Sequence, residues 1–300
     1  MENNKKIYEK HEKNAKNTKK TQNFTKNDKI LKYEDKIEFK KSLGQNFLFD
    51  KNLLNAIVVD GGVCSSDLVL EIGAGAGTLT EAIAKKCKRV ISFEIDKSLK
   101  QILDEKAEQN KNIEFHFEDF MNVDIDEFID EKCRVVANIP YYITTPIIFK
   151  LVEKLDKIKS ISVLIQKEVA ERFAGDFGSK TYGITSVILQ SVFDVTIPRI
   201  VKKECFTPMP KIDSALCKLV PHSKYNISDF EKFKDFVHKS FSMRRKTLVN
   251  NLKTLCEKGA LIETLSKYGY SEMVRPEDIS VENFVNIFND LNNCDKLILN

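Results

Sequence analysis

The fold of this chain is decided by residues 68–80, which read LVLEIGAGAGTLT. The first five residues form an apolar run typical of a buried strand, and a helical pattern follows over residues 79–86. Between them lie Gly73, Gly75 and Gly77. Glycines let the backbone approach a ligand closely, and a helix start offers free N–H groups. Strand, glycine-rich turn and helix in this order predict a nucleotide-type binding site.

The spacing of the glycines narrows the class of ligand. A dinucleotide fingerprint needs its third glycine at position 78, where this chain has Thr78. The spacing here is GxGxG, the form typical of sites for S-adenosylmethionine rather than for a pyrophosphate. Because a glycine-rich turn alone is a weak signal, the strands that follow carry the argument.

Carboxylates stand at the ends of the next two predicted strands. The strand over residues 90–93 ends in Glu94, about twenty residues after the first glycine, where a carboxylate can accept hydrogen bonds from ribose hydroxyls. The strand over residues 113–117 leads to Asp119, which is suited to accept from an adenine amino group. Each carboxylate alone is also typical of a solvated loop or a helix cap. The ordered set favours a site for the nucleoside part of S-adenosylmethionine.

A second binding element is predicted at residues 135–142, VVANIPYY. A buried strand ends there at Asn138, and Pro140 and two tyrosines follow. The amide supplies an acceptor and donors, and the rings supply flat stacking faces, which together suit a planar base with an amino group. Asn and Pro are also ordinary turn residues. The position at a strand end of an open α/β sheet favours the binding site.

The order of the predicted elements indicates the architecture. Strands and helices alternate from residue 68 to Asn138, the pattern of a doubly wound, Rossmann-like parallel sheet. Two last strands, at 195–200 and 214–220, are expected to close the sheet as an antiparallel hairpin. We expect the segment between them, residues 206–211, to be an exposed loop carrying Phe206.

Two polar residues, Gln45 and Asn46, stand between apolar ones and suggest a lid over the ligand. With 42% hydrophobic residues, the chain has enough core for one large domain and a smaller one. We expect an α/β, Rossmann-like S-adenosylmethionine-dependent methyltransferase domain over residues 37–221, with a boundary at Pro221-His222-Ser223. Residues 222–300 show helical periodicity without a strand pattern and predict a smaller all-helical, RNA-binding domain.

Basic residues gather at two places. Residues 1–41 hold thirteen lysines against seven acids, a net charge of +6 in a chain whose total is +4. With little to bury, residues 1–36 are predicted to be a disordered basic tail that either contacts RNA phosphates or is merely solubilising. In the helical part, Arg244, Arg245 and Lys246 are adjacent cations that we expect to contact RNA phosphates rather than to form a solvated helix face.

The cysteines and the hydropathy pattern indicate the compartment. Seven cysteines stand singly, without a CxxC pair, and only four histidines are present, so no disulfide framework and no metal site is expected. No apolar run is long enough to cross a membrane, and the N-terminus lacks a signal-peptide pattern. These features favour a cytoplasmic protein. The chain has no tryptophan, so stacking must fall to Phe and Tyr.

Taken together, the motifs resemble the ribosomal RNA adenine N6,N6-dimethyltransferases of the small ribosomal subunit. The resemblance runs from about residue 42 to near the end of the chain and is carried by residues 43–48 (LGQNFL), 71–80 (EIGAGAGTLT), 138–141 (NIPY), 166–172 (QKEVAER), 178–183 (GSKTYG), 206–215 (FTPMPKIDSA) and 244–248 (RRKTL). The erythromycin-resistance adenine methylases share the glycine loop and the NIPY element but are less similar over 178–183 and 206–215.

The resemblance implies contacts with S-adenosylmethionine at several positions, to which the residue patterns add Gln45 and Gly75. The implied contacts are Asn46, Leu48, Gly73, Glu94, Asp119 and Asn138. It also implies the substrate, two adjacent adenosines in the 3′-terminal hairpin loop of small-subunit (16S) rRNA, which become N6,N6-dimethyladenosines during late subunit biogenesis. The expected partner is the pre-30S particle, bound by a monomer.

The expected chemistry follows from the poor nucleophilicity of adenine N6, whose lone pair is delocalised into the ring. The side-chain oxygen of Asn138 and the carbonyl of Ile139 are placed to accept the two amino hydrogens, which favours the transition state. Tyr141 on one face of the base and Phe206 on the other are expected to clamp it. With Pro140, these residues complete the predicted catalytic set.

A ribosome-assembly or nucleic-acid-binding factor on the same fold is the alternative from another class. In such a factor the methylation activity would be dispensable or lost. The intact Asn138, Pro140 and Tyr141 argue against loss.

Overall fold

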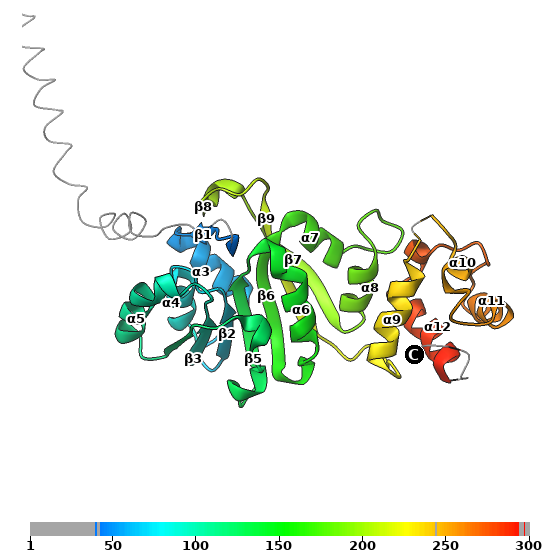
Figure 1. Cartoon of the computed structure of the whole chain (residues 1–300), viewed down its shortest axis with the longest axis horizontal. Helices are drawn as coiled ribbons and strands as arrows, with labels where there is room; N and C mark the ends of the chain where they lie inside the picture. Colours follow the sequence, from blue (N-terminus) through cyan, green and yellow to red (C-terminus); the bar gives the residue numbers. More distant parts are fainter. Residues whose placement is uncertain (1–39, 41–42, 244, 294–296, 298–300) are drawn as a thin grey trace, which may run out of the picture. The chain divides into compact units, whose positions relative to one another are not determined.

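The structure is a computed structural model that describes residues 40, 43–243, 245–293 and 297. From residue 43 on, these residues belong to one compact unit, Lys41–Asn300 (Figure 1). The predictions made for the tail over residues 1–36 and for Arg244 lie outside the described residues.

A seven-stranded sheet organises this unit. Its order is β4-β3-β2-β5-β6-β9-β7. The strands are β2 (Leu68–Ile72), β3 (Arg89–Phe93), β4 (Ile113–His116), β5 (Cys133–Asn138), β6 (Ile158–Gln166), β7 (Phe193–Val201) and β9 (Ser214–Pro221). The first five are parallel, and β9 pairs antiparallel with both β6 and β7. The predicted Rossmann-like sheet with an antiparallel closing pair is therefore confirmed.

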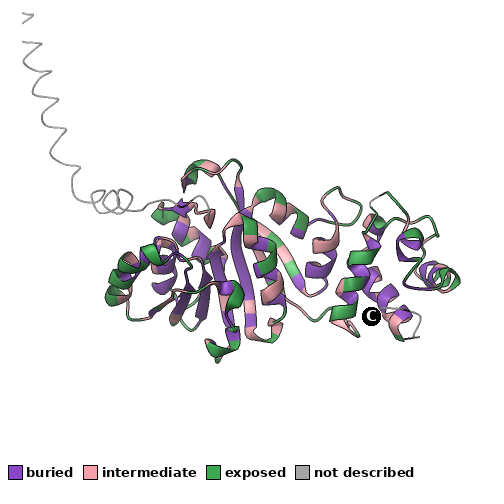
Figure 2. Ribbon diagram, in the orientation of Figure 1, coloured by how far each residue is buried: buried purple, intermediate pink, exposed green. Residues whose placement is uncertain are grey.

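Helices cover both faces of the sheet because the strand residues alternate between two cores. Leu68 and Leu70 pack in one cluster with residues of α6 and α7, whereas Val69 packs in the other with residues of α3 and α4. The inner strands β2, β3, β5 and β6 are accordingly buried on both sides, whereas the edge strands β4 and β7 are partly exposed (Figure 2). The helices that accompany the sheet are α3 (Lys51–Asp60), α4 (Thr78–Ala84), α5 (Lys100–Gln109), α6 (Thr144–Val152), α7 (Lys167–Phe173) and α8 (Ile184–Gln190).

Four helices follow the sheet, namely α9 (Phe230–Ser240), α10 (Leu248–Leu252), α11 (Lys258–Lys267) and α12 (Val281–Asn293). Their apolar cluster includes Val187 and Ile188 of α8. The hydroxyl of the buried Tyr182 also donates to the carbonyl of Ile279, 2.8 Å away. The helical lobe thus shares its core with the last helix of the sheet region, and the domain boundary expected near residue 222 stays a prediction.

The expectation of an exposed aromatic at position 206 was wrong. Residues Phe206–Thr207 form β8, which pairs antiparallel with β1 (Phe47–Leu48). Only 3% of Phe206 is exposed, because its ring packs in the cluster that contains Leu48 and Val201. The exposed apolar residue of this loop is Met209, at 60%.

Within the described part of the chain, no helix combines the length and the apolar character that a membrane crossing requires. The six described cysteines are free thiols.

Candidate active site

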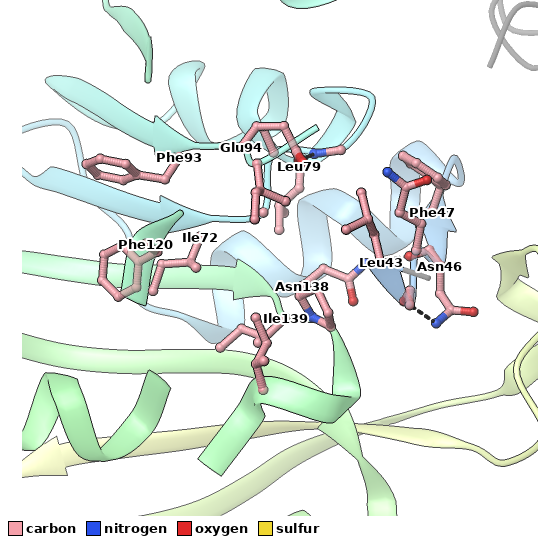
Figure 3. A pocket seen from close by; sticks show the side chains of 18 of the residues that line it. Leu43, Asn46, Phe47, Ile72, Leu79, Phe93, Glu94, Phe120, Asn138 and Ile139 are labelled. Carbon is pink, nitrogen blue, oxygen red and sulfur yellow. Dashed lines mark hydrogen bonds between the residues drawn. The ribbon is translucent and has the colours of Figure 1, made fainter. Parts of the chain in front are cut away.

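A pocket opens at the carboxyl ends of β2, β3 and β5, where β3 continues the sheet on one side of β2 and β5 continues it on the other. In open α/β sheets, this switch point is where ligands bind. Residues 43–48, 72–76, 78–79, 93–95, 118–121 and 138–143 line the pocket. Ile72, Phe93 and Phe120 lie together toward one end, and Leu43, Asn46 and Phe47 lie toward the other, with Asn138 between them (Figure 3).

The structure brings most of the sequence-predicted site residues into this one pocket. They are Gln45, Asn46, Leu48, Gly73, Gly75, Glu94, Asp119, Asn138, Ile139, Pro140 and Tyr141. Phe206 is not among the lining residues, and neither are Arg245 and Lys246, which are exposed between α9 and α10. The roles assigned to all of these residues stay predictions.

The glycine loop has left-handed backbone at its three glycines, with φ of +82° at Gly73, +55° at Gly75 and +70° at Gly77. A Cβ added at Gly75 would lie 2.9 Å from Cε1 of Phe47. A Cβ added at Gly77 would lie 2.7 Å from Cδ of Lys106. Both glycines are therefore needed for conformation and for space.

The side chain of Glu94 holds the glycine loop through a hydrogen bond to its backbone. Its Oε2 accepts from the Gly75 N–H at 2.7 Å, and its Oε1 accepts from the Asp96 N–H at 2.8 Å. Burial raises the pKa of Glu94 above its ordinary value, and these two backbone hydrogen bonds oppose the rise. Each carboxylate oxygen keeps a further acceptor position, so the geometry is compatible with the predicted ribose contact.

A second buried carboxyl, Glu71, lies on β2 directly before the loop and is fully buried. Its Oε2 accepts from Thr80 Oγ1 at 2.5 Å and from Ser92 Oγ at 2.6 Å, while Oε1 has no hydrogen-bond partner among the described residues. Burial raises the pKa of Glu71 to about 8, with a further contribution from the charge of Glu94. Through these contacts Glu71 ties β2, β3 and α4 together.

The orientation of Asn138 is fixed by residues 43–48, which we call the entrance segment. Its Nδ2 donates to the main-chain oxygen of Asn46 at 2.7 Å. Since a carbonyl oxygen can only accept, the amide nitrogen must face Asn46, which leaves Oδ1 as the remaining acceptor. Asn46 itself is held by a hydrogen bond from its Nδ2 to the Gly44 oxygen at 3.0 Å.

Tyr141 is anchored on the other side of the strand end. Its hydroxyl lies 2.6 Å from Ser214 Oγ, at the start of β9. Burial raises the pKa of Tyr141, partly offset by the serine, so the phenol is neutral at physiological pH.

Asp119 caps a short helical turn by accepting from the Met121 N–H with Oδ1, at 2.9 Å. Its second oxygen, Oδ2, accepts no hydrogen bond from the described residues, which leaves it available for the predicted adenine contact.

Sequence reasoning missed Asp96. Gln45 Nε2 donates to Asp96 Oδ2 at 2.9 Å, which ties the entrance segment to the loop after β3. The signal was present, because Asp96 follows Glu94 by two residues and caps the next helical turn. Sequence reasoning counted Tyr142 among the two rings with stacking faces but left it out of the predicted catalytic set, and the structure places it in the lining of the pocket.

The chain is similar to known proteins over most of its length. Residues 36–293 match the family model described as ribosomal RNA adenine dimethylase. The chain is 44% identical to the ribosomal RNA small subunit methyltransferase A of Caldanaerobacter subterraneus subsp. tengcongensis, covering 84% of this chain and 97% of the relative. It is 40% identical to the protein of the same name from Bacillus mycoides, covering 90% and 96%.

Solved structures give the same picture. A dimethyladenosine transferase from Plasmodium falciparum superposes with a TM-score of 0.73 at 25% identity, covering 84% of this chain and all of that one. The 23S rRNA methyltransferase ErmE superposes with a TM-score of 0.68 at 26% identity, covering 82% of this chain and all of that one.

The fold and the pocket define a Rossmann-like, S-adenosylmethionine-dependent methyltransferase. Within that class, the chain belongs to the ribosomal RNA adenine dimethylase family. It is an S-adenosylmethionine-dependent rRNA adenine dimethyltransferase.

The residues of the pocket fit this cofactor. The glycine loop offers backbone without side chains, and at Gly73 a Cβ would come no closer than 3.6 Å to another residue, the Asn138 main-chain oxygen. Glu94 and Asp119 supply acceptors for hydroxyl and amino hydrogens, and Phe93 and Phe120, 5.5 Å apart, supply apolar walls for an adenine ring. In this arrangement Glu94 is the residue that would hold the ribose, and Asp119 the adenine amino group.

Proposed function

We propose that this enzyme transfers methyl groups to N6 of two adjacent adenosines in the 3′-terminal hairpin loop of small-subunit (16S) rRNA. The products would be N6,N6-dimethyladenosines, formed in the cytoplasm on a pre-30S particle late in subunit biogenesis, by a monomer. The observation that carries the proposal is the preset amide of Asn138, whose Oδ1 remains as an acceptor in the pocket. The choice of small-subunit RNA is supported by the names of relatives at 40–44% identity.

The side chains of the pocket act on the base. When bound, S-adenosylmethionine supplies an electrophilic methyl group. Asn138 Oδ1 and the Ile139 carbonyl accept the hydrogens of N6, which favours a pyramidal nitrogen with a localised lone pair. The ring of Tyr141, held by Ser214, gives the base a fixed stacking face. Because donor and acceptor positions are set before the base arrives, little reorganisation is needed at the moment of transfer.

Phe206 can act as the second clamp on the target base only if its side chain moves. Its ring is 97% buried in the core cluster that contains Leu48, so it must leave that cluster to reach a base. Met209 lies in the same loop and is exposed, as the sequence had predicted for Phe206.

For RNA docking we propose the cations between α9 and α10. Arg245 and Lys246 are exposed, and neither has an ion-pair partner among the described residues. Arg244 belongs to the same proposal but lies outside the described residues. Free exposed cations are available to phosphates, which they would position without reading sequence.

Two other functions fit the chain less well. A large-subunit adenine methylase has a structural relative in ErmE, yet the 26% identity of that match is well below the 40–44% of the small-subunit methyltransferases. An assembly factor without catalysis would not need Asn138 held by Asn46 in a pocket next to the glycine loop.

The proposal is tested by mapping tritiated methyl groups. Small-subunit particles lacking the modification are incubated with enzyme and labelled S-adenosylmethionine, with large-subunit rRNA as the control. We expect label only in the 3′-terminal hairpin of the small-subunit rRNA, as dimethyladenosine, and far slower labelling with the Asn138→Ala variant. Label in large-subunit rRNA, or binding of particles without any transfer, would replace the proposal by one of the two alternatives.

A further inference from the structure

Two consecutive tyrosines at the end of β5 have opposite environments. The hydroxyl of Tyr141 is anchored on Ser214 Oγ at 2.6 Å, and its ring is half-buried. Tyr142 is 59% exposed, and its hydroxyl has no hydrogen-bond partner among the described residues. Both line the pocket. The first tyrosine is therefore used by the site described above, whereas the second has no assigned task.

The ring of Tyr142 is nevertheless held in place. Gly44 has a left-handed backbone, with φ of +60°, and a Cβ built on it would lie 3.1 Å from Cδ1 and 3.3 Å from Cε1 of Tyr142. The same position lies 3.8 Å from Cβ of Pro140. The missing side chain at Gly44 thus lets the ring rest on the entrance segment. One part of the ring is supported by backbone while the remainder faces solvent at the pocket.

A supported, exposed aromatic next to a base pocket has a specific use in RNA enzymes. Every base has a π-face, so single-stranded nucleotides stack on such rings without sequence readout. The target base must leave its stack to enter the pocket, and its neighbour in the chain then loses a stacking partner as well. The ring of Tyr142 is one residue from the ring that would face the target base.

We propose that Tyr142 is the stacking platform for the nucleotide adjacent to the target adenosine. This inference rests on the proposed function and adds to it a second base position, outside the pocket and filled by a single-stranded neighbour. Stacking there replaces the contact that the neighbour loses when the target flips, so Tyr142 acts on RNA binding and positioning and touches no reacting atom.

The absence of tryptophan from the chain gives a direct test. Tyr142→Trp introduces a single indole at the platform, and Phe177→Trp introduces one at another exposed aromatic position, which does not line the pocket. Each variant, with S-adenosylhomocysteine bound, is titrated with a single-stranded oligoadenylate and with the 3′-terminal hairpin RNA. We expect both RNAs to quench the emission of the Tyr142→Trp protein and to leave that of the Phe177→Trp protein unchanged. Equal emission changes in the two proteins, or none in either, would overturn the inference.

Kinetics give an independent readout. Tyr142→Ala should raise KM for the RNA by roughly five- to a hundredfold, the range expected from loss of one base–aromatic stack. Tyr142→Phe should restore the wild-type KM, because the ring and not the hydroxyl does the stacking. Calorimetry with S-adenosylhomocysteine reports whether the Ala variant is folded.

The two proposals fail in distinguishable ways. If wild-type enzyme does not methylate the hairpin adenosines, the proposed function fails, while quenching by oligoadenylate still tests the platform. If wild-type enzyme methylates them and Tyr142→Ala has an unchanged KM, the platform alone is wrong.

Discussion

Asn138 and Asn46, which are 92 residues apart in the sequence, meet through a hydrogen bond of 2.7 Å between the side-chain nitrogen of the first and the main-chain oxygen of the second (Figure 3). The entrance segment therefore does more than cover the pocket. It determines which end of the Asn138 amide is available, and it leaves the acceptor end for the base.

Asn138→Ala should reduce the single-turnover rate of methyl transfer by about 10²- to 10³-fold, since the loss of one preorganised transition-state partner costs roughly 2.7 to 4 kcal/mol. Affinity for S-adenosylhomocysteine should weaken only moderately. Rapid-quench measurements at saturating cofactor check the rate. Wild-type speed in this variant would remove Asn138 from the catalytic set.

Glu94→Gln should weaken cofactor binding and leave the saturated rate nearly unchanged. The carboxylate accepts from two backbone N–H groups, Gly75 and Asp96, and an amide places its own N–H₂ against one of them. The ribose lies away from the reacting methyl, so its contacts bind ground and transition states alike. Calorimetry with S-adenosylhomocysteine gives the dissociation constant. An unchanged constant would contradict the assignment.

Gly75→Ala should abolish cofactor binding, and backbone strain alone should not account for the loss. The new Cβ would meet Phe47 at 2.9 Å in a backbone of φ +55°. The matched control is Gly178→Ala, where φ is +80° but nothing lies within 4 Å. Both variants should lose about 1–2 kcal/mol of stability from the left-handed backbone. Only the Gly75 variant should lose affinity for S-adenosylhomocysteine, and equal affinities in the two would contradict the packing argument.

Glu71→Gln should flatten the pH dependence of stability. The pKa of Glu71 rises from 4.5 to about 8 in the folded protein, so between these values the folded state holds a proton that the unfolded chain has released. The stabilisation is complete below pH 4.5, falls as pH rises by up to about 1.36 kcal/mol per unit, and is lost above about pH 8. Urea unfolding over this pH range measures the slope. An unchanged slope in the Glu71→Gln variant would refute a neutral buried carboxyl.

Replacement of Arg244, Arg245 and Lys246 by alanine should weaken binding to small-subunit particles and flatten its salt dependence. Each lost phosphate contact lowers the slope of log K against log salt by roughly 0.7 to 0.9. Deletion of residues 1–36, the predicted basic tail, which lies outside the described residues, is expected to have a smaller effect. Filter binding over a salt series compares the two. A larger effect of the deletion would move the RNA site away from the helical lobe.

Local signals were sufficient for the parallel sheet and for much of the pocket. The strand, glycine turn and helix at residues 68–80, and the polar residues at strand ends, are properties of short segments, and strand ends of a parallel sheet meet at one edge. The sequence alone therefore places Glu94 and Asn138 in one pocket.

Contacts between distant segments were not accessible in the same way. Phe206 stands among prolines and polar residues, which locally favour an exposed loop, and its burial depends on pairing with residues 47–48. The bond between Asn46 and Asn138 likewise depends on where the entrance segment folds. Local periodicity contains no information about either partner.

The apolar cluster that α8 shares with α9–α12 has a genetic consequence. Val187, Ile188 and Tyr182 are buried against helices encoded after residue 222. A premature stop codon near residue 222 would leave these side chains facing water, so the catalytic part would be made without its cover and exposed to proteases. Recombination that exchanged the helical part between homologues would meet the same constraint, because the incoming helices would have to match a surface on the resident half. Selection therefore acts on the two stretches as one inherited block.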